Sequence, residues 1–370
     1  MRLVCLLFAV CFLLSCRDEF EVFPVAAEEN AGEILAQKGV VRVKLSESTA
    51  RSLTVDESRG VVETGDAAWD AVARSLGAYR MKRAFPPAGK FEERHRKWGL
   101  HLWYDIYFDE EVSTRSACED LESLTGVEIV EEIFVPHVDY RRVAPLTVPA
   151  QIDVPMAVSE GMPFNDPMLP EQWHYHNTGQ VVPSVSGADV NLFEAWTYET
   201  GSRNVIVAVL DEGVDINHED LRANIWVNPG EISGDGIDND GNGYVDDVNG
   251  FNFHTMQAYI KPMLHGTHVS GTIAAVNDNG VGVGSIAGGT LYSPGVQIMV
   301  CQMLEEKNVT MVGNLFDAFV YAADNGASIA QCSWSYGDWN QYYNQSQITA
   351  MDYFIENAGI DVDGNQVGPM

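Results

Sequence analysis

Residues 205–215 read Val205-Ile206-Val207-Ala208-Val209-Leu210-Asp211-Glu212-Gly213-Val214-Asp215, and this stretch decides the fold class. Its first six residues are continuously apolar, which is typical of a strand buried on both faces within a parallel sheet. Asp211 follows directly, and open α/β sheets place their ligands and catalytic groups at the carboxyl ends of the strands. The stretch therefore predicts an α/β domain with a carboxylate at its functional edge.

A second stretch, residues 265–275, reads His265-Gly266-Thr267-His268-Val269-Ser270-Gly271-Thr272-Ile273-Ala274-Ala275. It begins polar and continues in small residues, which predicts a closely packed helix with His265 at or before its amino terminus. An Asp and a His from separate elements are two parts of a Ser-His-Asp relay. Taken alone, Asp211 could be a turn or cap residue, and His265 could be structural. A metal pair of His265 with His268 is weak, since no interposed Glu and no third ligand are evident.

The two stretches resemble the Asp and His motifs of the subtilisin-like (subtilase) serine peptidases. Residues 207–215, followed by 218–221, match the first motif, and residues 265–272 match the second, in the family's order. The resemblance runs from about Asn165 to the end. It implies a three-layer α/β/α fold with a mainly parallel sheet, and an endopeptidase in which Asp211 orients His265. It also implies peptide substrates, bound by Ser333, Trp334 and Ser335 in a strand over residues 331–337.

The sequence also departs from the family pattern. Subtilases take their nucleophile from a Gly-Thr-Ser segment and an oxyanion donor from an Ala-Gly-Asn-type segment, and neither segment is present. We therefore expect a catalytic domain truncated before its Ser motif and inactive as it stands. The alternative is a non-catalytic, calcium-binding surface lipoprotein or an inactive fragment of a peptidase gene.

The front half predicts a smaller α+β unit. Strand patterns at 40–45, 79–85, 102–108 and 127–130 alternate with helices at 67–76, capped by Asp66, and 113–124. The order β-α-β-β-α-β is the ferredoxin-like arrangement. Beside the subtilase motifs, this unit resembles the propeptide that chaperones and inhibits such enzymes. The expected organisation is a ferredoxin-like propeptide at 40–143, a linker at 144–164, and an incomplete catalytic domain at 165–370.

The amino terminus predicts export. Met1-Arg2 precedes an apolar run from Leu3 to Leu14, which is too short to span a membrane but suits a signal peptide over residues 1–15. The ending Leu13-Leu14-Ser15-Cys16 resembles a bacterial lipobox, which implies lipidation of Cys16 and a linker at 16–39. The expected location is the outer membrane or cell surface, held there by one lipid-modified end.

The charge is strongly acidic and uneven. The net charge is −31, which argues against nucleic acid as a partner, because binding phosphates needs clustered Lys and Arg. Only four of the 22 basic residues but 28 of the 53 acidic residues lie after residue 146. A less acidic front half against a strongly acidic back half fits a complementary interface between propeptide and catalytic domain.

Residues 238–243 read Asp238-Asn239-Asp240-Gly241-Asn242-Gly243, which matches the start of an EF-hand calcium loop. Asn249 stands at position twelve, where a bidentate Glu is expected, although Asp247 could compensate. The alternative is a solvated acidic turn. A second, weaker calcium site, which resembles one in the family, pairs Asp220 with Asp278 in the loop 276–280. The predicted ligands of the first site are Asp238, Asp240, Asn242, Tyr244, Asp246 and Asp247.

Overall fold

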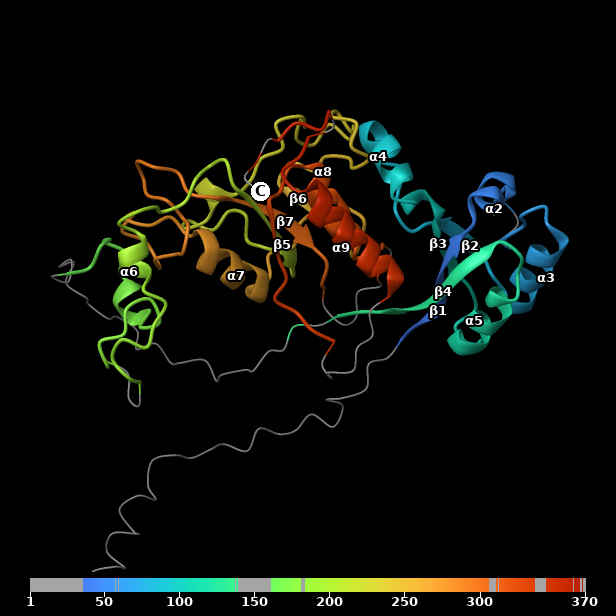
Figure 1. Cartoon of the computed structure of the whole chain (residues 1–370), viewed down its shortest axis with the longest axis horizontal. Coiled ribbons are helices and arrows are strands. Elements are labelled where there is room, and N and C mark those ends of the chain that lie inside the picture. Colours follow the sequence, from blue (N-terminus) through green and yellow to red (C-terminus); the bar gives the residue numbers. More distant parts are fainter. Residues whose placement is uncertain are drawn as a thin grey trace, which may run out of the picture. The chain divides into compact units, whose positions relative to one another are not determined.

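Two four-stranded sheets organise the residues that the computed structural model describes (Figure 1). These residues are 36–56, 58, 60–136, 138, 161–180, 184–305, 311, 313–336, 344–361, 363–366 and 368. Among them no helix is long and apolar enough to cross a membrane. The predicted lipidation residue Cys16 and most of the predicted linker at 144–164 lie outside the described residues.

The first sheet is antiparallel and has the strand order β2-β3-β1-β4. Helix α3 begins after Asp66, whose side chain accepts the amide N–H groups of Ala68 and Trp69, as the sequence predicted. The order of strands and helices confirms the predicted ferredoxin-like unit. Its elements are β1 (Ala36–Leu45), α2 (Glu47–Ser52), α3 (Ala67–Leu76), β2 (Arg80–Arg83), β3 (Trp103–Tyr107), α5 (Thr114–Glu122) and β4 (Val127–Phe134).

A segment between β2 and β3, residues 84–102, extends this unit, and we call it the β2–β3 arm. It contains the short helices η1 (Gly89–Phe91), α4 (Glu92–Lys97) and η2 (Leu100–Leu102). The sequence pattern did not predict these helices. The reason is physical: α4 reads Glu-Glu-Arg-His-Arg-Lys and has no apolar stripe, so no helical period was visible in the sequence.

The second sheet is parallel and has the strand order β6-β7-β5-β8. Val207 and Val209 of β5 join the apolar cluster with α7, whereas Ala208 and Leu210 join the cluster with α8 and α9. Both faces of β5 are thus buried, which explains its continuous apolar run and confirms the three-layer α/β/α prediction (Figure 1). The elements are β5 (Ile206–Asp211), β6 (Gly250–Asn252), α7 (Leu264–Ala274), β7 (Gln297–Gln302), α8 (Asp317–Asp324), β8 (Ile329–Gln331), α9 (Gln345–Asn357), and the short η3 (Leu169–Glu171), α6 (Leu192–Ala195) and η4 (Arg222–Asn224).

Buried polar contacts join the antiparallel sheet to the α/β domain. Arg42 of β1 is 1% exposed and pairs with Asp105 of β3, at 2.7 Å from Nε to Oδ1 and 3.1 Å from Nη2 to Oδ2. Its Nη1 group also donates to Asn314 Oδ1 at 2.9 Å and to Ser346 Oγ at 3.3 Å. A charge removed from water needs such partners, so these contacts tie the two parts of the chain together.

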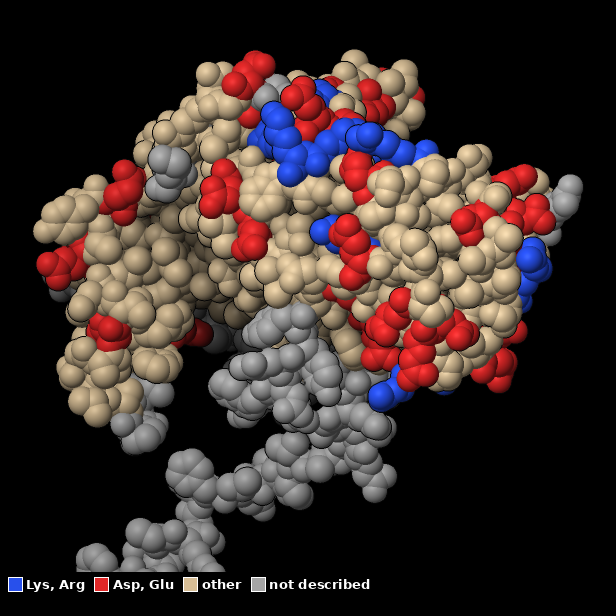
Figure 2. All heavy atoms as spheres, turned by 45° about the vertical axis from the view of Figure 1, so that its right-hand side comes forward, with Lys and Arg blue, Asp and Glu red and all other residues tan. Residues whose placement is uncertain are grey.

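The surface reflects the acidic composition. On the face drawn in Figure 2, Asp and Glu side chains are spread widely, whereas Lys and Arg gather mainly in one group, with a few elsewhere. The β2–β3 arm contributes basic side chains that pair with acidic or carbonyl oxygens of the α/β domain. Arg94 of α4 donates to the carbonyl oxygens of Ile360 and Asp361, at 3.3 and 3.1 Å.

Candidate active site

Asp211 is the last residue of β5, at the carboxyl end of the parallel sheet. Strand β7 pairs beside it, with Gln302 directly opposite Asp211. The Asp211 side chain is fully buried, and the carboxylate atom Oδ1 accepts the Glu212 backbone N–H at 2.6 Å. Because charge is costly to bury, this burial raises the pKa of Asp211, and a hydrogen bond with His265 acts in the opposite direction.

His265 is the second residue of α7, and its Nδ1 atom lies 2.7 Å from Asp211 Oδ1. The two residues are 54 positions apart in the chain, and the fold brings them into hydrogen-bond contact. A carboxylate at this distance accepts from Nδ1–H, so the neutral imidazole keeps its lone pair on Nε2. This tautomer is the one that a general base in a Ser-His-Asp relay requires.

Two glycines allow the backbones that carry this pair to approach closely. A Cβ atom on Gly266 would lie 2.4 Å from the Glu212 carbonyl oxygen, and one on Gly213 would lie 1.8 Å from the Lys261 carbonyl oxygen. A larger residue at Gly266 would force α7 away from the turn after β5, and one at Gly213 would displace the segment that precedes α7. The Gly after His265 and the Gly two positions after Asp211 are therefore part of the geometry that joins the two side chains.

The predicted substrate-binding residues lie next to β5, but not within a strand as expected. Strand β8 ends at Gln331, so the prediction of a strand over residues 331–337 is wrong. A longer β8 would pair its backbone N–H with the Leu210 carbonyl of β5. In this structure the Leu210 carbonyl accepts the indole N–H of Trp334 instead, at 2.8 Å. Ser333 and Trp334 are half-buried and Ser335 is exposed, beside the strand end that carries Asp211.

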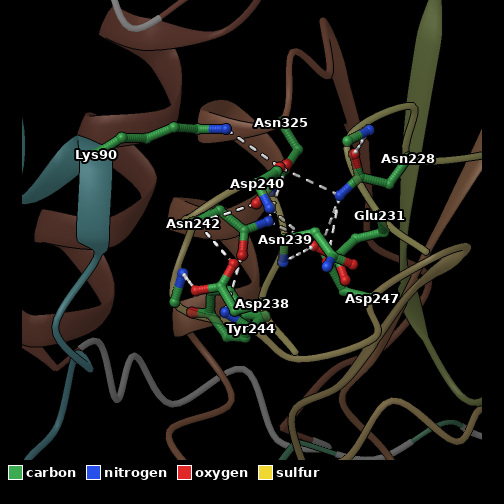
Figure 3. Close-up of polar contacts among 12 residues, drawn as sticks. Lys90, Asn228, Glu231, Asp238, Asn239, Asp240, Asn242, Tyr244, Asp247 and Asn325 are labelled. Carbon is green, nitrogen blue, oxygen red and sulfur yellow. Dashed lines mark hydrogen bonds and ion pairs between the residues drawn. The ribbon is translucent and has the colours of Figure 1, made fainter. Parts of the chain in front are cut away.

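An acidic cluster lies in the loop that precedes β6. Ligand atoms of Glu231, Asp238 and Asp240 all lie within 4.8 Å of one another (Figure 3). The cluster includes Glu231, which the EF-hand-like pattern does not predict because this residue stands outside the hexapeptide. Its Oε1 atom accepts the backbone N–H groups of Asn239 and Asp240, at 2.8 and 3.1 Å, and these bonds draw the carboxylate into the loop.

The other predicted ligands of this loop have different partners, and the two carboxylates among them, Asp246 and Asp247, are not part of the cluster found among the described residues. Asp246 accepts the backbone N–H groups of residues 234–236. The Asn242 amide donates to Asp247, and the Tyr244 hydroxyl donates to Asp317. Asp247 is fully buried, which raises its pKa to about 6.

The weaker predicted pair, Asp220 and Asp278, lies around the loop 278–283. Asp220 Oδ1 accepts the Asn279 side-chain amide at 2.7 Å, and Oδ2 accepts the Val283 N–H at 3.1 Å. Asp278 Oδ1 accepts the Asn165 N–H at 3.2 Å. Both carboxylates thus hold loop backbone or amide groups, and the only acidic cluster found among the described residues is the one around Glu231.

Comparison with known proteins assigns both halves of the chain to one family. The family model described as "Subtilase family" matches residues 202–360, and the model described as "N-terminal of Subtilase family" matches residues 41–179. The first match includes the Asp211–His265 pair and the acidic cluster. The second includes most of the antiparallel sheet and the whole β2–β3 arm.

Curated relatives match between about two fifths and two thirds of the chain. Subtilisin-like protease 1 of Plasmodium vivax is 37% identical over 144 residues, which are 38% of this chain and 22% of that protein. Halolysin of Haloferax mediterranei is 34% identical over 144 residues, 39% of this chain and 24% of that protein. Kexin of Saccharomyces cerevisiae is 27% identical over 266 residues, 67% of this chain and 28% of that protein. This chain thus spans less than a third of the length of each of these relatives. On the two family matches, the chain belongs to the subtilase family.

Proposed function

We propose that this protein is a serine endopeptidase precursor in which Asp211 and His265 activate a serine hydroxyl. The observation that carries the proposal is the 2.7 Å contact between His265 Nδ1 and Asp211 Oδ1 at the end of a central parallel strand. His265 Nε2 would take the serine proton, and the Asp211 carboxylate would stabilise the imidazolium that results. His265 would then return the proton to the leaving amine, so the base acts as an acid in the second half of the step.

We assign substrate binding to Ser333, Trp334 and Ser335. This assignment is supported by the Trp334 indole, which holds the segment against the Leu210 carbonyl immediately before Asp211. An extended peptide placed along this segment would pass beside the Asp211–His265 pair. The segment offers backbone and hydroxyl groups, which suit recognition of a peptide main chain.

The antiparallel unit is proposed to act as a propeptide that helps the α/β domain to fold and blocks it until removed. Support comes from the buried contacts of Arg42 with Asn314 and Ser346, which would have to be broken before the unit leaves. The His95 side chain adds a buried contact of 2.6 Å with Asp324. The interface also has an apolar part, because buried side chains of the antiparallel unit and of α8 and α9 belong to one hydrophobic cluster.

Calcium is the proposed structural ion, held by Glu231, Asp238 and Asp240. Three carboxylates offer the hard oxygen ligands that calcium prefers. The Lys90 ammonium, 3.1 Å from Asp240 Oδ2, shows that one of these carboxylates already binds a positive charge. Bound calcium would neutralise the repulsion among these groups. Saturating calcium should then raise the free energy of unfolding by about 2.7 kcal/mol at a hundredfold excess over Kd. Equal melting temperatures in calcium and in chelator would contradict the site.

Export and lipid attachment at Cys16 remain part of the proposal. They rest on the amino-terminal sequence alone, which has a short apolar run followed by Ser15-Cys16. Metabolic labelling with an alkyne fatty acid in a bacterial host should modify the chain, and Cys16→Ala should abolish that labelling. Labelling that persists in the variant would place the lipid elsewhere.

The peptidase activity can be tested with a fluorophosphonate probe, which labels activated serine hydroxyls. The 370 residues contain no Gly-Thr-Ser segment, so we expect no labelling of this chain and no hydrolysis of casein above background. The chain continued in its reading frame through such a segment should be labelled. In that longer chain, Asp211→Asn should lower turnover by about 10⁴, the loss known for this position in a Ser-His-Asp relay. Labelling of Ser333 or Ser335 would identify a nucleophile within these 370 residues and refute their assignment to substrate binding. A stop codon directly after Met370 would refute the peptidase proposal and favour a non-catalytic lipoprotein.

A further inference from the structure

The β2–β3 arm and the acidic cluster meet at one point. Lys90, in helix η1 of the arm, lies with its Nζ atom 3.1 Å from Asp240 Oδ2, a bond between residues 150 positions apart (Figure 3). The Asp240 side chain is only 9% exposed, and that of Lys90 is 36% exposed. The ammonium is therefore the cation that this structure places at the carboxylates proposed to hold calcium.

Backbone packing around Lys90 and Asp240 supports this side-chain contact. The Lys90 backbone N–H donates to the Gly241 carbonyl at 2.8 Å, one residue after Asp240. A Cβ atom on Gly89 would lie 1.9 Å from that same carbonyl oxygen, and one on Gly243 would lie 2.6 Å from the Pro87 carbonyl oxygen. The arm and the acidic loop thus pack backbone against backbone, with glycine on both sides, and this packing directs the Lys90 side chain to Asp240.

We infer that Lys90 and calcium compete for Asp240, so that docking of the arm and binding of calcium oppose each other. The inference rests on the calcium site proposed above. Both ligands are cations and both need the Asp240 carboxylate, so each must lower the affinity for the other by the same factor. The arm belongs to the unit proposed to be removed during maturation. Its departure would withdraw the ammonium and leave the cluster to calcium, which links release of the propeptide to metal loading of the α/β domain.

The test measures calcium affinity by isothermal titration calorimetry with calcium chloride on the purified chain. Lys90→Met keeps most of the side-chain length and removes the charge, and we expect it to tighten calcium binding about threefold to tenfold, the range for losing a partly buried ion pair. High salt should shrink this difference, because screening weakens the ion pair. The matched control is Lys97→Met in α4, since Lys97 pairs with Glu93 at an exposed position and should leave the affinity unchanged.

A second variant reaches the same contact without touching the lysine. Gly89→Ala places a Cβ atom against the Gly241 carbonyl and should push the arm away. Calcium affinity should then rise as it does in Lys90→Met, although Lys90 is still present. An unfolded variant would be recognised by loss of the cooperative thermal transition, and Lys90→Met would still decide the question.

The outcomes separate this inference from the site on which it rests. Equal calcium affinity in the unaltered chain and in Lys90→Met, together with loss of binding in a chain carrying both Asp238→Asn and Asp240→Asn, would leave the calcium site standing and refute the competition. Calcium binding in none of the proteins, including Lys90→Met, would overturn both. Tighter binding in Lys90→Met and Gly89→Ala, with Lys97→Met unchanged, is the expected result.

Discussion

Replacing Arg42 with Met should strongly destabilise the folded chain. The guanidinium and its partner Asp105 are both 1% exposed, and two of its hydrogen bonds are charge-assisted contacts of 2.7 and 3.1 Å with that carboxylate. Met fills much of the same volume but leaves Asp105 buried without its counter-charge. Breaking a buried pair in this way costs about 3–5 kcal/mol, and the lost contacts with Asn314 and Ser346 act in the same direction.

The assay is urea unfolding followed by far-ultraviolet circular dichroism. The matched control is Arg115→Met, which removes the same side chain from an exposed pair with Glu119, at 85% and 69% exposure. That change should cost no more than about 0.5 kcal/mol. The double variant Arg42→Met with Asp105→Leu should recover part of the loss, because no uncompensated charge remains.

A loss below about 1 kcal/mol in Arg42→Met would refute the reasoning, since it would mean that water or another cation compensates Asp105. The reasoning would also be refuted if the double variant lost as much free energy of unfolding as the two single variants together. Additive losses show that two residues do not interact, whereas paired residues give a coupling energy of about 0.5–3 kcal/mol.

Three further predictions concern the site and the interface. Gly266→Ala should lower the free energy of unfolding in urea by about 1–3 kcal/mol and shift the His265 imidazole resonances. Gly271→Ala, whose Cβ would meet open space, should raise the free energy of unfolding by about 0.5–1 kcal/mol, and equal effects of the two changes would contradict the close approach of α7 to the turn after β5. Burial raises the pKa of Glu131, so folding binds a proton there, and the free energy of unfolding should fall as pH rises from about 4.5 through the raised pKa. Glu131→Gln should remove this contribution to the pH dependence of stability, and the same pH dependence in both proteins from about pH 4 to 8 would contradict the prediction. Trp334→Phe removes the donor to a buried β5 carbonyl and should cost about 1 kcal/mol; no loss in urea unfolding would mean that water replaces it.

The arrangement of the active-site pair could be predicted in part. The apolar run before Asp211 and the small-residue helix after His265 are local patterns, and each places its residue at the end of an element. What the patterns could not supply is the 2.7 Å contact itself, which depends on the packing of α7 against β5. The predicted strand around Trp334 failed for the same kind of reason, because one indole takes the carbonyl that a longer strand would use.

The acidic loop shows the limit of a sequence motif most clearly. The EF-hand-like spacing identified Asp238 and Asp240, which do lie in the cluster, together with Asp246, which instead accepts backbone N–H groups from residues 234–236. Glu231 was missed. The EF-hand spacing assumes one loop conformation. This loop turns differently, so that Glu231, seven residues before Asp238, supplies the third carboxylate of the cluster.

The sequence by itself determined the parts that depend on neighbours in the chain: the buried strand β5, the cap of α3 by Asp66, the ferredoxin-like order and the resemblance to subtilases. The first three follow from periodicity and capping within a few residues, whereas the resemblance rests on the motifs at residues 207–215 and 265–272. Only the tertiary structure decided which distant polar groups meet, such as Lys90 with Asp240, 150 residues apart, and Arg42 with Ser346, 304 residues apart. The reason is that a polar or charged side chain carries no periodic signal of its own, and its partner is chosen by the packing that excludes water around it.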